Sequence, residues 1–112
     1  MSELKKTVEI TSSIGSVRQK NLTDAYKLPV TIFNKSSVGF QKAEVAVKDE
    51  GSNQVYTCYF GAIAAGSSAR EYASLPGGIE MCIWKILPDI GDEIYGFGMA
   101  DNAGGVDLTI TD

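Results

Sequence analysis

Apolar and polar residues alternate with a period of two along most of the chain, as in strands buried on one face. The most regular pair, residues 40–48 and 54–60, is joined by a turn and predicts a hairpin. Six further strands are predicted at 4–12, 26–34, 69–75, 79–87, 93–100 and 106–111. Eight short strands predict an all-β, single-domain antiparallel β-sandwich over residues 1–112, with a barrel as second choice.

Glycine and proline positions refine this expectation. Residues 61–68 predict a crossing from one sheet to the other, and residues 101–105 predict a hairpin turn. Pro29 cannot donate a backbone N–H group, so the strand 26–34 is expected at a sheet edge or to start after it. Short strands with glycine corners resemble immunoglobulin-like and lectin-like sandwiches. The paired cysteines with an intervening tryptophan that mark true immunoglobulin domains are missing.

The strand at 79–87 is unusual because both of its faces are apolar, whereas a sandwich strand normally shows one face to water. One face carries Ile79, Met81, Ile83 and Leu87, and the other carries Cys82, Trp84 and Ile86. Either a loop such as 13–25 or a second subunit is expected to cover the outer face. Alternation alone does not decide which face is the outer one.

Aromatic side chains supply the candidate binding residues, which are Trp84, Tyr95, Phe97 and Tyr56. Tyr95, Phe97 and Met99 share one face of their strand, and glycines occupy the positions between them. The alternatives are ordinary core filling and an aromatic platform for a protein, a sugar ring or an apolar ligand. Tryptophan and tyrosine are also frequent at protein interfaces.

Several kinds of catalysis are excluded by residue type. The sequence contains no histidine, which removes histidine-based triads, general bases and zinc ligands. Cys58 and Cys82 are expected to be free, buried thiols, and a disulfide requires that their strands lie side by side or face each other. No glycine-rich phosphate loop is present. The chain is therefore predicted not to be an enzyme, with a carboxylate-dependent enzyme as a distant third hypothesis.

Charge adds two weaker hypotheses. The net charge of −4 argues against a nucleic-acid partner. Residues 1–50 carry a net +2 and residues 51–112 a net −6, either by chance or as an acidic end that attracts a basic one. Asp89, Asp92 and Glu93 form a candidate calcium site because carboxylate oxygens suit this ion; no other cofactor is expected.

No secretory signal or membrane-length apolar run is present, so a cytoplasmic location is the default expectation, and export without a signal stays open. The leading functional hypothesis is a non-enzymatic binding module that self-associates and recognises a protein or glycan through loops or an exposed sheet face. The alternative is a structural subunit of a larger homo-oligomeric assembly.

Overall fold

The computed structural model describes residues 7–12 and 26–112, which form eight strands and, within those ranges, no helix. Each predicted strand has a counterpart, so the all-β prediction is confirmed. No helix in the described ranges could span a membrane. The strands are β1 (Thr7–Ser12), β2 (Tyr26–Lys35), β3 (Phe40–Asp49), β4 (Val55–Phe60), β5 (Ser68–Leu75), β6 (Ile79–Pro88), β7 (Ile94–Ala103) and β8 (Val106–Thr111).

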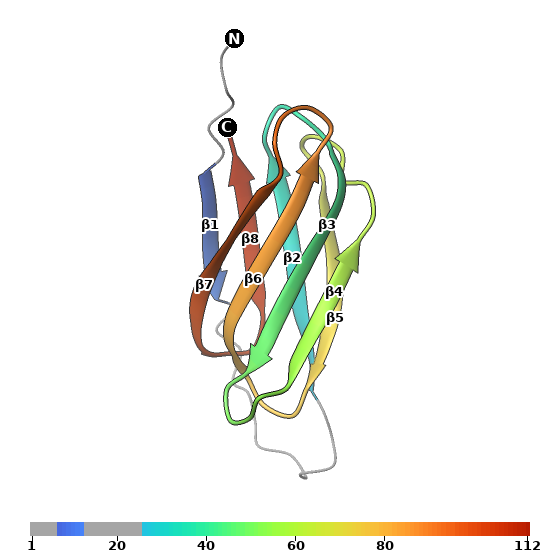
Figure 1. The fold of residues 1–112 in the computed structure, drawn as a ribbon. Coiled ribbons are helices and arrows are strands. Elements are labelled where there is room, and N and C mark those ends of the chain that lie inside the picture. The colour runs from blue at the N-terminus through green and yellow to red at the C-terminus, as the bar shows by residue number, and fades with distance from the viewer. Residues whose placement is uncertain (1–6, 13–25) are drawn as a thin grey trace.

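The strands form two four-stranded sheets that pack face to face instead of closing into a barrel (Figure 1). The strand orders are β1-β8-β2-β5 and β4-β3-β6-β7. The β3–β4 hairpin and the crossing between β4 and β5 are confirmed. The prediction of an entirely antiparallel fold is wrong in one place, because β2 and β8 pair in parallel. The chain enters β8 from β7 in the opposite sheet, and β8 then runs in the same direction as β2.

Two local predictions are also wrong. Residues 101–105 do not close a hairpin, since β7 pairs with β6 while β8 pairs with β1 and β2. The strand that contains Pro29 is central, between β8 and β5. The pairing of β2 with β8 begins only at Val30. At Pro29, β5 is therefore the one paired neighbour of β2 among the described strands, and the missing N–H group lies outside the pairing with β8.

The core lies between the two sheets and draws on both. It contains Val30, Ile32, Leu75, Val106, Leu108 and Ile110 from one sheet and Phe40, Val45, Val47, Cys82, Trp84 and Ile86 from the other. Ile79 also points inward, contrary to the strict alternation predicted for this strand. The register shifts between Ile79 and Met81, and this bulge places both Ile79 and Cys82 on the inner face.

A buried polar side chain, Asn34, ties the end of β2 to the crossing segment 61–67. Its Nδ2 donates to the carbonyl oxygens of Val38 at 2.9 Å, Ile63 at 3.2 Å and Ala64 at 3.3 Å. Its Oδ1 accepts hydrogen bonds from the backbone N and Oγ of Ser36. Every polar atom of this amide is therefore satisfied within the fold, which is what a buried polar group requires.

The two halves of the chain, which differ in net charge, both contribute strands to each sheet. Strands β1, β2 and β3 come from the basic half, and strands β4 to β8 from the acidic half. Both sheets mix the two groups, since β2 lies between β8 and β5 and β3 between β4 and β6. Topology thus interleaves strands from the two halves.

Candidate functional site

The candidate site is the outer face of the sheet β4-β3-β6-β7. Cross-strand pairing arranges most of its outward side chains in three rows, and the pair Lys42 and Leu87 lies beyond the first of them. The first row is Tyr59, Glu44, Lys85 and Tyr95; the middle row is Thr57, Ala46, Ile83 and Phe97; the third is Val55, Lys48, Met81 and Met99.

The β6–β7 side of this face is apolar and open to water. We call Met81, Ile83, Tyr95, Phe97 and Met99 the β6–β7 apolar face. Relative exposures are 52% for Ile83, 73% for Tyr95, 69% for Phe97 and 66% for Met99. Large side chains at this exposure in adjacent register positions form a continuous patch, and such patches mark interaction sites more often than scattered surface residues do.

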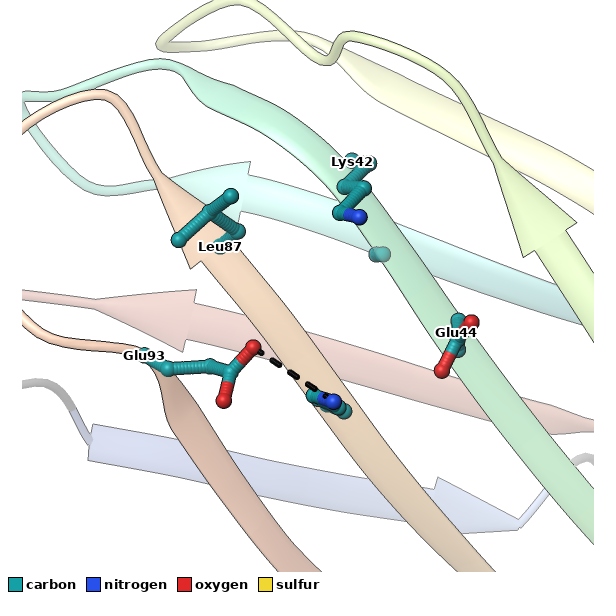
Figure 2. A pocket seen from close by; sticks show the side chains of 6 residues that line it. Lys42, Glu44, Leu87 and Glu93 are labelled. Atoms are coloured by element: carbon teal, nitrogen blue, oxygen red, sulfur yellow. Dashed lines mark ion pairs between the residues drawn. The ribbon is translucent and has the colours of Figure 1, made fainter.

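Lysine and glutamate side chains border this patch and form two pairs of opposite charge. Lys48 forms an ion pair with Glu80, and Lys85 Nζ lies 3.8 Å from an oxygen of Glu93. Figure 2 shows the second pair beside a depression lined by Lys42 and Glu44 of β3 and Leu87 of β6. The lining combines both charge signs with aliphatic carbon, so it supplies no concentrated field for a small anion or cation.

The structure separates the four aromatic residues that the sequence suggested as one group. Tyr95 and Phe97 lie on the β6–β7 apolar face. Trp84 lies in the core with 7% exposure, on the face of β6 that the second sheet covers, so it does not belong to the outer face. Tyr56 lies on β4 opposite Val47 of β3, in the alternation of the inner face, and β4 and β7 are opposite edges of the sheet.

Trp84 explains the glycine at position 96. A Cβ atom at Gly96 would lie 2.8 Å from Cζ2 of the indole ring, closer than real contacts allow. Gly96 therefore lets β7 approach the ring. The indole Nε1 is buried and has no hydrogen-bond partner among the described residues. The inner side of β7 is thus shaped by packing, while its outer side carries the exposed residues.

The acidic residues Asp89, Asp92 and Glu93 do not meet at one point. The Asp89 carboxylate lies against Gly39, Asp92 is exposed, and Glu93 faces Lys85. Within residues 7–12 and 26–112, no three acidic or cysteine side chains are close enough to hold a metal ion. The calcium prediction is therefore left without a preformed site.

The two cysteines are free and buried. Cys58 pairs with Val45 and Cys82 pairs with Val47, so their strands lie on either side of β3 and do not adjoin. Burial raises the pKa of each thiol from 9.0 to about 11, and the charge of Glu71 adds to the pKa shift of Cys58. Both thiols are protonated near neutral pH, the unreactive form of cysteine.

Comparison with known proteins adds information on fold alone. No family model matches the sequence. No curated protein matches it either. One solved structure is similar, the NMR structure of a protein from Eubacterium rectale, with a TM-score of 0.63 and 8% sequence identity over 82% of each chain. At this identity the similarity concerns the arrangement of strands, and it carries no site residue across.

Sequence reasoning found part of this surface and missed part. The two apolar faces of β6 and the row of Tyr95, Phe97 and Met99 were visible as alternation. Alternation also predicts that Glu44 and Lys48 point outward, but they were not among the candidate site residues, because their place beside the patch depends on the β3–β6 register. Glu44 and Lys48 alternate with the apolar residues of their strand in the same way as Ala46, and this pattern indicates that all three share one face.

Proposed function

We propose that this chain is a non-enzymatic interaction module that self-associates through the outer face of the sheet β4-β3-β6-β7. The observation that carries the proposal is the exposure of Ile83, Tyr95, Phe97 and Met99 on two adjacent strands. Covering these side chains with another protein surface removes apolar area from water, which is the main driving force of association.

The absence of histidine and the burial of both thiols support a non-enzymatic role. The sequence has no histidine, and the two thiols are buried with a raised pKa. The depression is lined by two carboxylates, Glu44 and Glu93, and Glu93 is held in an ion pair with Lys85. Two-sheet folds of the immunoglobulin-like or lectin-like kind commonly act by contact, and this chain is proposed to do the same.

A protein partner fits the centre of the face better than a glycan. Sugar recognition combines an aromatic ring with polar groups that bond the hydroxyls, whereas the middle row offers Ala46, Ile83 and Phe97 side by side. Polar groups stand only at the border, as in protein interfaces with an apolar centre and a charged rim. A glycan array tests the other ligand class: glycan binding that depends on Phe97 would contradict the protein assignment.

The test is the molar mass in solution of the wild type, Phe97→Asp and the matched control Tyr72→Asp, from about 5 to 500 μM. Tyr72 is an exposed aromatic residue on β5 of the other sheet. Light scattering after size exclusion should give a concentration-dependent dimer for the wild type and the control, and a monomer for Phe97→Asp. A wild-type monomer throughout, or equal loss in both variants, would overturn the proposal.

A structural subunit of an open assembly is the second candidate, favoured by one observation. β7 is an edge strand of its sheet, and its residues 94–100 carry no charge. An uncharged edge can pair with another strand, and repeated pairing builds an open array. A ladder of masses that grows with concentration would favour this candidate, whereas a closed dimer favours the first.

A further inference from the structure

The charges on β3 are placed symmetrically about the middle row of the candidate surface. Glu44 lies two residues before Ala46 and Lys48 two residues after it, and all three share the outer side of β3. Ala46 pairs with Ile83, which pairs with Phe97, so an apolar row separates a negative position from a positive one.

We infer that the partner on this face is a second copy of the chain, related by a two-fold axis that runs along the row Ala46–Ile83–Phe97. Such an axis reverses the strand direction and keeps the strand order. It therefore places Glu44 of each copy over Lys48 of the other. The interface then contains two symmetry-related contacts between opposite charges. The inference rests on the proposed function, and it adds the identity of the partner and the register of the contact.

The remaining positions agree with this arrangement. Ile83 and Phe97 meet their own copies on the axis, as residues of an isologous interface do. Tyr95 of one copy faces Met99 of the other, a sulfur–aromatic contact. Lys85 lies over Met81, where its aliphatic stem can cover the thioether while its ammonium group stays at the rim.

Net charge also favours a copy over an unrelated partner. The bordering charges on this face are the lysines at 42, 48 and 85, the glutamates at 44, 80 and 93, and Asp101, which follows Met99 in the outward alternation of β7. Although the chain carries −4 in total, the three lysines and four carboxylates of this face sum to −1, so two copies can approach with little repulsion. A strongly charged partner would gain nothing from such a surface.

The size of the face sets the concentrations needed for the test. Four strands about 4.8 Å apart and three rows about 6.7 Å apart give a flat footprint of a few hundred Å². That is at or below the roughly 800 Å² per partner typical of stable complexes. We therefore expect a dimer with a dissociation constant in the micromolar range, and measurements should extend to several hundred micromolar.

Charge reversal tests the register. E44K makes both positions basic and K48E makes both acidic, so each variant should repel itself and lose dimer affinity by about tenfold or more. Mixed in equal amounts, the two variants should form a heterodimer within a few-fold of wild-type affinity, because each Lys then faces a Glu. Sedimentation equilibrium measures the affinity of each variant alone and of the mixture. Native mass spectrometry, with one variant labelled with ¹⁵N, distinguishes the heterodimer from the two homodimers.

Matched controls are K27E and E71K, which change exposed residues on β2 and β5 of the other sheet and should leave the dimer unchanged. K48E also removes the ion pair with Glu80, so a thermal unfolding curve accompanies each variant. A measurement on the wild type avoids this problem. In a mixture of ¹⁴N and ¹⁵N chains, carbodiimide should join Glu44 of one isotope to Lys48 of the other.

The outcomes separate the two proposals. Heterodimer recovery together with the Glu44–Lys48 cross-link supports the two-fold register. A wild-type dimer that Phe97→Asp abolishes, but without heterodimer recovery or the cross-link, overturns the register and leaves the proposed function standing. A wild type that stays monomeric overturns both.

Discussion

The buried turn around Asn34 and the β6–β7 apolar face both contain residues that do not match their surroundings. Asn34 is a polar amide with no exposed surface in the interior. Phe97 is an aromatic ring in water. The amide is compensated by five hydrogen bonds from within the chain. The ring is not covered by any other described residue.

This difference separates residues that serve folding from residues that serve contact. A buried polar group persists in a fold only when its partners are also in the fold, because an unsatisfied donor or acceptor costs about 1–3 kcal/mol. An exposed apolar side chain loses almost nothing in the monomer, and its gain comes only when another surface covers it. Changes at Asn34 should therefore lower stability, and changes at Phe97 should lower association.

The largest effect is expected at the buried turn. Asn34→Ala removes all five hydrogen bonds of the amide. The carbonyl groups of Val38, Ile63 and Ala64 then keep one donor each, which are Ser36 Oγ and the backbone N–H groups of Phe40 and Ser67. We expect the free energy of unfolding to fall by about 2–4 kcal/mol in urea titration. Asn53→Ala, in the exposed β3–β4 turn, is the control and should change it by less than about 0.5 kcal/mol. A loss below about 1 kcal/mol at Asn34 would remove the contrast.

The second-largest effect is expected on the inner face of β7. Gly96→Ala places a methyl group 2.8 Å from the Trp84 ring, which must shift. Overpacking of this kind costs about 1–3 kcal/mol. Gly61→Ala is the control, since its Cβ atom would meet nothing within 4 Å. Thermal unfolding of both variants checks the result, and an unchanged midpoint for Gly96→Ala would mean that the inner face of β7 is not tightly packed.

The sequence predicts where the strands lie better than it predicts which strands are neighbours and which faces are buried. Period-two alternation located all eight strands, because each has an inner and an outer side. It did not give strand neighbours, so the parallel pairing of β2 with β8 and the central place of Pro29 were missed. For β6, with two apolar faces, alternation could not decide whether Trp84 or Ile83 would be buried. That choice follows from which face the second sheet covers, a tertiary property.

The buried thiol of Cys82 makes the stability of the fold depend on pH. Because burial raises the pKa of Cys82 to about 11, the folded chain keeps its proton while the unfolded chain loses it above pH 9. Stability should therefore fall as pH rises from about 9 to 11, by about 1 kcal/mol for this thiol at pH 10. Urea titrations of the wild type and Cys82→Ala at pH 8 and 10 isolate the effect, since tyrosine and lysine titration is common to both. Equal pH dependence would contradict it.

The smallest effect on stability is expected at the exposed ring, and it is the most direct test of the contrast. Phe97→Ser removes an aromatic side chain that is 69% exposed, so the monomer loses little packing. We expect a change below about 0.5 kcal/mol in urea unfolding at low micromolar concentration, where a micromolar dimer contributes little. At several hundred micromolar the wild type should gain stability that Phe97→Ser does not gain. A loss of 2 kcal/mol at low concentration would instead assign the ring to folding, because only contacts within one chain act there.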